Sequence, residues 1–227
     1  MSFPLLIPTI LSQIIFDTLE AFQRNLLVLV VYLAIAAFVF YKIYEDVSDY
    51  VSVEFDRDSL EQQLAAADLT AALSLKFNFA DRYKPQDFCV LNMTAFNHTE
   101  MQPLYINWER STLANLQGES QRLIRVVPGG INLAQPQVPG IVAPGRKLIE
   151  QLTTEEALQS DLEGKLVAGG PLLGAQAVRV AIASQKPFTL RLIVELPSSP
   201  AQAGQIHALL CHFRLSQTPL PRALYWN

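Results

Sequence analysis

The chain has 227 residues, half of them hydrophobic, with 17 basic and 21 acidic side chains and a formal net charge of −4. This length allows one ordinary domain with an added segment, or two small domains. The charges are balanced and form no basic stripe, which argues against a nucleic-acid-binding protein.

Residues 1–24 predict an amphipathic helix. Apolar residues, among them Ile14 and Phe22, recur at three- and four-residue spacing, and most polar side chains fall away from that stripe. Such a helix can lie in a membrane interface or pack on a partner's helix, so Ile14 and Phe22 are candidate partner contacts. A short helix buried on the protein's own domain is the alternative.

Residues 25–44 predict a transmembrane helix. No charge occurs between Leu26 and Tyr41, and the apolar run approaches the roughly 20 residues that cross a hydrocarbon core. A cleaved signal peptide fits poorly, because acidic residues precede the run and a basic n-region is missing; a buried core helix is the other alternative. The expected lipid-facing positions are Leu26, Val30, Leu33, Ala37, Phe40 and Tyr44.

The prediction is therefore an uncleaved single-pass anchor with membrane lipid as one partner. The flanking charges hardly indicate how the span is oriented in the membrane, because Arg24 and Lys42 place one basic residue on each side of it. Residues 45–69 follow as a connector, in which DRDSLEQQLAAA predicts a short helix capped by Asp58 or Ser59.

Residues 70–227 predict a mainly β domain, an antiparallel sandwich. Short runs rich in Val, Ile, Leu, Phe and Thr alternate with turn-forming segments, a pattern typical of sandwiches. One helix is expected within it, over residues 152–164. The expected core includes Phe96, Leu104, Ile106 and Trp108. The predicted strands are ALSLKFNF, FCVLNMTAF, PLYINW, SQRLIRVV, AVRVAIA, FTLRLIVELP and HALLCHFRLS.

One part of this domain resembles a known family. The sequence runs from an Asn-x-Thr turn through LYINW to a Gly turn and a Ser-x-Arg-hydrophobic strand. In this it resembles the immunoglobulin-like domain of small bacterial membrane-attached proteins and lipoproteins, over about a third of the chain. The resemblance implies a noncatalytic sandwich outside the cytoplasm. The chain departs from that family by lacking a lipobox cysteine and by using a membrane span. The matching residues are Asn97, Thr99, Trp108, Gly118, Ser120, Arg122 and Ile124.

The residues that could carry chemistry form no catalytic pattern. His207 and His212 fall on opposite faces of a strand, as do Cys211 and His212, so neither pair can share a metal or a proton. The loop AGGPLLGA lacks the Lys-Ser/Thr of a phosphate-binding loop and leads into a predicted strand. We therefore expect no enzyme activity, cofactor or metal site. Cys89 and Cys211 are interpreted as core thiols, with a disulfide as the alternative.

The last predicted feature is the aromatic pair Tyr225 and Trp226, which either folds back on the domain or docks on a partner. Together these features favour a non-catalytic, membrane-anchored accessory or scaffold subunit that packs on other subunits of a larger membrane complex. The alternative is a membrane-tethered module that captures a ligand or client peptide, through a free strand edge for example.

Overall fold

The computed structural model describes residues 25–44, 49–197 and 204–219. The chain divides into two compact units, Met1–Val47 and Ser48–Asn227, and we call the second unit the β-domain. In the first unit, the structure describes the apolar helix Asn25–Tyr44. The amphipathic helix predicted over residues 1–24, with Ile14 and Phe22, and the aromatic pair Tyr225 and Trp226 lie outside the described residues.

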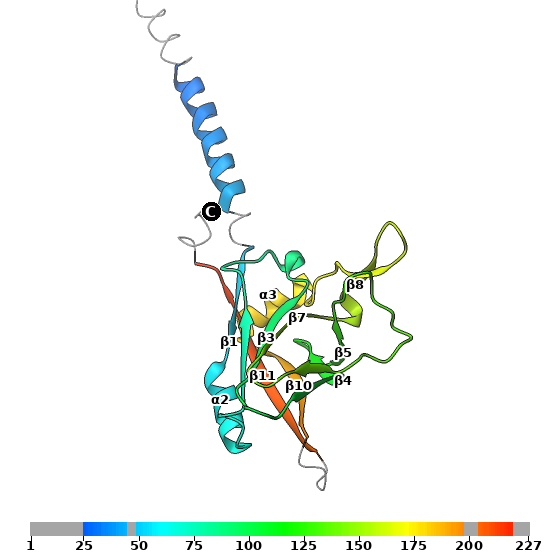
Figure 1. Ribbon diagram of the computed structural model, residues 1–227. Helices are drawn as coiled ribbons and strands as arrows, with labels where there is room; N and C mark the ends of the chain where they lie inside the picture. Colours follow the sequence, from blue (N-terminus) through cyan, green and yellow to red (C-terminus); the bar gives the residue numbers. More distant parts are fainter. Residues whose placement is uncertain (1–24, 45–48, 198–203, 220–227) are drawn as a thin grey trace, which may run out of the picture. The chain divides into compact units, whose positions relative to one another are not determined.

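The β-domain is built mainly from antiparallel strands (Figure 1). Its elements in chain order are β1 (Val51–Phe55), α2 (Arg57–Ala66), β2 (Leu73–Asn78), η1 (Pro85–Asp87), β3 (Leu91–Asn97), β4 (Leu104–Ala114), β5 (Ser120–Arg125), β6 (Gly140–Val142), β7 (Lys147–Thr154), η2 (Glu155–Ala157), β8 (Leu158–Ser160), β9 (Leu166–Ala168), α3 (Ala175–Ser184), β10 (Phe188–Leu196) and β11 (Gln205–Gln217).

Nine of these strands form one sheet that nearly closes on itself like a barrel. Their order is β1-β11-β10-β4-β5-β7-β3-β2, and β6 pairs with β4. β5 turns the corner, because its first half pairs with β4 and its second half with β7. Past β2, Tyr83 exchanges two backbone hydrogen bonds of 2.8 Å with Val51 of β1. The predicted mainly β, antiparallel fold is confirmed in this barrel-like form.

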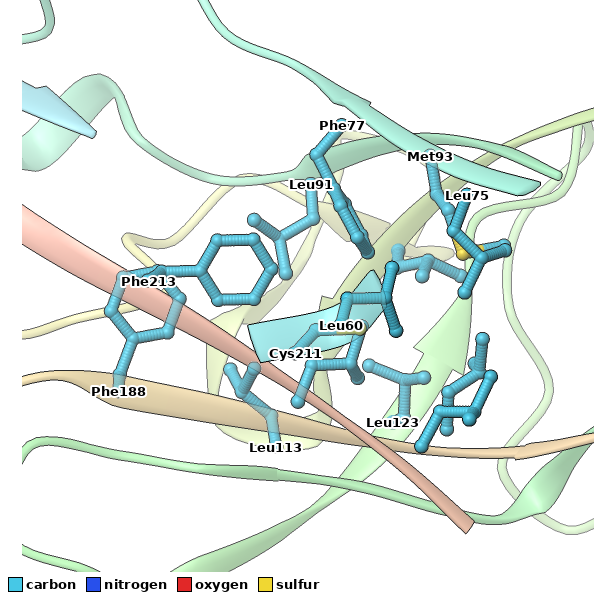
Figure 2. Close-up of a cluster of buried hydrophobic side chains, with 14 of the residues drawn as sticks. Leu60, Leu75, Phe77, Leu91, Met93, Leu113, Leu123, Phe188, Cys211 and Phe213 are labelled. Carbon is cyan, nitrogen blue, oxygen red and sulfur yellow. The ribbon is translucent and has the colours of Figure 1, made fainter. Parts of the chain in front are cut away.

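The core forms because the inward residues of each strand are apolar at every second position, the period of a strand. In β3, for example, Leu91, Met93 and Ala95 are fully buried. An aromatic cluster fills one part of this core, with the Phe213 ring centre 4.9 Å from that of Phe77 and 4.8 Å from that of Phe188. Figure 2 shows these rings facing the aliphatic side chains of neighbouring elements.

Three of the four residues expected in the core, Leu104, Ile106 and Trp108, are fully buried on the inner face of β4. The expectation for Phe96 needs correction. Phe96 has the opposite parity to the buried residues of β3, so its side chain is half-buried on the other face. There its ring lies 4.5 Å from that of His98, centre to centre.

The connector expected over residues 45–69 needs correction too, because most of it belongs to the β-domain. Val51 and Val53 of β1 and Leu60 and Leu64 of α2 are buried in the same core as the later strands. α2 also begins earlier than its sequence predicts: Asp56 is its N-cap and accepts a hydrogen bond of 3.1 Å from the Ser59 N–H.

The secondary structure predicted for two segments is wrong. Residues 152–164 do not form the expected helix. Leu152, Thr153 and Thr154 are buried in β7 between β3 and β5, and only the three-residue 3-10 turn η2 and the small β8–β9 hairpin follow. Pairing on both sides overrides the local helical preference. AVRVAIA, expected as a strand, lies in α3, where Val178 and Ala181 share the buried face at helical spacing.

Candidate functional site: the apolar helix and the exposed surfaces of the β-domain

The helix Asn25–Tyr44 has the length and composition of a membrane span. It has 20 residues with a mean hydropathy of 2.5, and none of its hydrophobic window is buried. At about 1.5 Å per residue it measures about 30 Å, the thickness of a hydrocarbon core. Such a helix near the N-terminus is found in membrane anchors and in signal sequences alike. It contains all six positions expected to face lipid: Leu26, Val30, Leu33, Ala37, Phe40 and Tyr44.

The end of this helix nearer the β-domain in sequence is aromatic. Tyr41 and Tyr44 are both exposed there, and Tyr32 is exposed near its middle. Tyrosine is enriched where a span leaves the hydrocarbon, because its ring is apolar and its hydroxyl can hydrogen-bond to headgroups and water. This end therefore has the side chains that a membrane–water interface favours.

An apolar hollow on the β-domain lies along α3. Its volume is about 510 Å³, and Leu116, Ala177, Val180 and Ala181 contribute to its walls. Val180 is 60% exposed although it lies on a helix whose opposite face is in the core. Exposed apolar surface of this kind is typical of a contact with another protein.

A second hollow, of about 570 Å³, lies where β1 meets α2 and is lined by charged residues. Its polar groups already have structural roles. Asp56 caps α2 through one carboxylate oxygen, and its other oxygen lies 3.4 Å from the guanidinium of Arg214. These interactions tie α2 to β1 and β11.

Two glutamines protect strand edges that the sheet leaves open. β1 pairs with β11 only as far as Phe213, and farther along the same edge the side-chain amide of Gln63 bonds to the Leu210 backbone. Similarly, Gln137 donates to the Leu123 carbonyl at 2.7 Å and accepts from the Arg125 N–H at 2.8 Å. Sequence reasoning missed both, because a glutamine in a polar segment usually indicates a solvated surface.

Beyond Leu210 the edge of β11 is open. In an antiparallel strand, every second residue points its backbone N–H and C=O groups to the same side. The backbone groups of Ile206 and Ala208 therefore point to the same side as those of Leu210. Within the described part of the chain, no group pairs with them on that side. The Ile206 side chain is 52% exposed as well. This edge could accept an extended peptide strand.

The two cysteines are both free. Cys211 is fully buried in the core, and this burial raises the pKa of its thiol to about 12. Cys89 precedes β3, and burial together with the nearby Asp87 carboxylate raises the pKa of its thiol. Both thiols are therefore protonated at neutral pH. The alternative of a disulfide between neighbouring strands is not met, because β3 and β11 are not neighbours in the sheet.

The three histidines lie at separate positions, and two of them lie within hydrogen-bond distance of a hydroxyl group. His98 Nε2 lies 2.9 Å from Ser74 Oγ, and His212 Nδ1 lies 3.0 Å from Thr189 Oγ1. His207 is half-buried on the opposite face of β11 from His212. Among the described residues, no three His, Cys, Asp or Glu side chains gather in a way that could hold a metal ion.

An ion pair holds the long loop after β5 against the sheet. The Arg122 guanidinium donates to both carboxylate oxygens of Glu109, at 2.8 and 2.9 Å. The Gln137 N–H donates to the same carboxylate at 3.2 Å. The Arg122 hydrogen bonds, and then that of Gln137, lower the pKa of Glu109. The contacts indicate a structural role, because the carboxylate is already engaged by groups of its own chain.

The residues of the motif that resembles immunoglobulin-like domains form hydrogen bonds and a turn that support the fold. Asn97 is fully buried, and its side chain donates to the carbonyls of Gln102 and Val142 and accepts from the N–H and hydroxyl of Thr99. Gly118 has a φ of +88°, as its predicted turn requires. No protein-family model, no curated protein and no solved structure matches this chain.

Proposed function

We propose that this chain is a non-catalytic, single-pass membrane-anchored accessory or scaffold subunit of a larger membrane protein complex. The observation that carries the proposal is the apolar helix Asn25–Tyr44, which the described residues of the chain leave uncovered. Apolar surface in water costs about 25 cal/mol per Å² relative to its burial. Lipid and the helices of other subunits are the surroundings that remove this cost.

The exposed surfaces of the β-domain complete the proposal. In this proposal the hollow beside α3 is the contact with a soluble face of another subunit, and Val180 fills a recess on that partner. An apolar centre with a polar rim is the usual anatomy of such a contact. Gln117, Gln176 and Lys186 also line the hollow and supply polar groups for its rim.

The finer assignment to immunoglobulin-like sandwich domains belongs to the same proposal. Its support is the set of contacts made by Asn97 and Thr99, the turn at Gly118 and the buried Trp108. The family resemblance also favours the extracytoplasmic side of the membrane for the β-domain. Tagging residue 162, in the exposed turn of the β8–β9 hairpin, for accessibility to an impermeant label in intact cells tests that side.

The test of the subunit proposal is extraction of the full chain in mild detergent, followed by native size analysis with the proteins that co-migrate. Co-migration in a fixed ratio with a large assembly is expected. Val180→Lys is expected to release the chain from that assembly, whereas Ile149→Lys is not. Both side chains are 60% exposed, so Ile149→Lys controls for a new surface charge. A wild-type chain that migrates alone as a monomer or dimer refutes the proposal.

A second candidate function rests on the open edge of β11. A module that captures a client peptide would pair the peptide with the backbone of Ile206 and Ala208. Ala208→Pro removes the outward N–H and leaves the hydrogen bonds to β10, which come from the neighbouring residues. Two results together would favour this second function over the first. The wild-type chain binds a peptide that Ala208→Pro does not bind, and the wild-type chain does not co-migrate with a large assembly in detergent.

A further inference from the structure

The helix Asn25–Tyr44 carries one polar side chain well inside its apolar run. From Leu26 to Phe40 every side chain is a hydrocarbon except that of Tyr32. Tyr32 is seven residues from the first residue of the helix and twelve from the last, which is about 10 Å and about 18 Å along the axis. A tyrosine side chain is shorter than either distance. When the helix crosses a bilayer, the Tyr32 hydroxyl therefore lies within the hydrocarbon layer.

At that depth the hydroxyl needs a hydrogen-bond partner from outside its own helix. The backbone groups around it are already paired with one another, as in any helix that spans a membrane. The Tyr32 side chain is 69% exposed, and none of the hydrophobic window of the helix is covered by the described part of the chain. A hydroxyl that leaves water without gaining a new hydrogen bond is unfavourable. The acceptor therefore has to come from another molecule in the membrane.

The residues that share the side of the helix with Tyr32 are spaced as in a helix–helix contact. Successive residues are rotated by about 100°, so Asn25 and Val39, seven residues before and after Tyr32, lie within about 20° of it. Val28 and Ala36 lie about 40° to either side. We call these five residues the Tyr32 face. A seven-residue spacing keeps the same side of one helix against another when the two cross at a shallow angle.

The Tyr32 face is distinct from the side of the helix that is expected to face lipid. All six expected lipid-facing positions are rotated from Tyr32 by about 80–160° in one direction. They are Leu26, Val30, Leu33, Ala37, Phe40 and Tyr44. Ala36, one turn after Tyr32, is the one residue of this helix that its neighbours leave only half-exposed. A small residue at this point allows a second helix to come close to the backbone.

A second copy of the chain meets the requirement of Tyr32 at the correct depth. Identical chains enter a membrane in the same orientation, so equal residues of two neighbouring copies lie at equal depth. A hydroxyl can both donate and accept. When two Tyr32 faces meet across a two-fold axis, one Tyr32 hydroxyl can donate to the other. The amide of Asn25 is also both donor and acceptor, and the face carries no charge that would make two copies repel.

We propose that two copies of the chain pair in parallel through their Tyr32 faces, with a hydrogen bond between the two Tyr32 hydroxyls. This inference rests on the membrane span of the proposed function, and it adds that the chain is present in the complex as a pair. It involves the apolar helix alone. A contact with the helix of a different subunit would instead have to bring an acceptor to this one depth.

Cysteine cross-linking of the full chain tests which side of the helix is paired. Cys89→Ser removes the half-buried thiol and leaves the buried Cys211. In this background, Val28→Cys and Val39→Cys place a thiol on the Tyr32 face, whereas Val30→Cys and Ala37→Cys place one on the expected lipid-facing side. Each variant is reconstituted at a low protein-to-lipid ratio and oxidised with copper phenanthroline. The first pair should form disulfide-linked dimers about fivefold faster than the second, because a disulfide needs close approach.

A second pair of variants tests the hydroxyl itself. Tyr32→Phe keeps the ring and removes the hydroxyl, and should slow cross-linking of Val39→Cys about threefold, as the loss of one interhelical hydrogen bond does. Tyr41→Phe makes the same chemical change on the opposite side of the helix and should leave the rate unchanged. Equal cross-linking at all four cysteine positions, faster cross-linking on the lipid-facing side, or no effect of Tyr32→Phe overturns the inference.

Flotation and native size analysis separate this inference from the proposed function. A chain that does not float with lipid, or that alkaline carbonate removes, lacks the membrane span, and both then fail. If the chain co-migrates with a large assembly but its Tyr32 face does not cross-link to a second copy, the inference alone fails. If the face cross-links and the chain migrates only as a dimer, the inference stands and the proposed function fails.

Discussion

The side-chain amide of Gln63 forms two hydrogen bonds with the backbone of Leu210, accepting from its N–H and donating to its C=O, each at 2.8 Å. The amide thus takes the place of a strand residue where β1 has ended and α2 has begun. An exposed sheet edge is a template for unwanted pairing with other chains. A helical side chain protects this edge at a point that the backbone of β1 does not reach.

Replacing Gln63 by Leu should destabilise the domain and open the edge. The change leaves two backbone groups to be satisfied by water, so we expect a loss of about 1 kcal/mol in the free energy of unfolding. Urea unfolding of the full chain in detergent, followed by near-UV circular dichroism, measures it. Gln62→Leu, at an exposed neighbouring position, is the control. Equal stability of the two variants would show that the amide pairing contributes nothing.

Asn97→Ala should have a larger effect on stability, because Asn97 is fully buried and uses both its amide nitrogen and its oxygen. Truncation leaves the carbonyl of Val142 and the N–H of Thr99 without this partner. We expect a loss of about 3 kcal/mol, as found when buried polar groups lose their hydrogen bonds. Asn92→Ala, at a half-buried position of the same strand, should cost less than about 1 kcal/mol. A similar cost for both would contradict the role given to Asn97.

Gly140 is needed because the Trp108 ring lies against its backbone. A Cβ at this position would lie 2.8 Å from Cζ2 of Trp108 and 2.9 Å from Cδ2 of Leu148. Gly140→Ala should therefore cost about 1–3 kcal/mol, as overpacking does. In a double-mutant cycle, Trp108→Phe provides the missing space. The combined loss should then be smaller than the sum of the two single losses, whereas strict additivity would exclude the contact.

Stability should fall in acid partly through Glu109, whose folded-state pKa lies below its ordinary value because of Arg122 and Gln137. A carboxyl with a depressed folded pKa contributes its full stabilisation above the ordinary value of 4.5. That contribution is lost as the pH falls through the folded pKa. Unfolding midpoints of the wild type and Glu109→Gln, measured from pH 7 to pH 3, should differ most at pH 7 and converge in acid. A constant difference would refute this linkage.

Cys211 should resist alkylation while the chain is folded. Its thiol is buried, and a pKa of about 12 leaves almost no thiolate at neutral pH. Labelling with iodoacetamide, followed by mass spectrometry, should modify Cys211 only above the denaturant concentration at which the β-domain unfolds. Cys89 is only partly buried and should react first. Labelling of Cys211 at the rate of Cys89 under native conditions would show that the core opens at β11.

Local pattern was sufficient to predict the apolar helix and most of the strands. A charge-free run of span length and a period-two alternation reflect solvent preference residue by residue, and both can be read without knowing any neighbour. Leu104, Ile106 and Trp108 are buried because they share one parity within one strand. The turn at Gly118 is equally local, since a backbone with a φ of +88° favours glycine.

Tertiary structure alone decided the elements whose local signals conflict. Residues 152–154 have helix-forming neighbours, yet pairing with β3 and β5 makes them a strand. AVRVAIA has the composition of a strand and becomes α3, because Val178 and Ala181 can be buried together only at helical spacing. Three further features join residues that are distant in sequence. They are the barrel-like closure at Val51 and Tyr83, the Gln63 and Gln137 amides at strand edges, and the hydrogen bond between the Thr218 N–H and the Tyr50 carbonyl. Such contacts depend on the path of the whole chain, which no local pattern encodes.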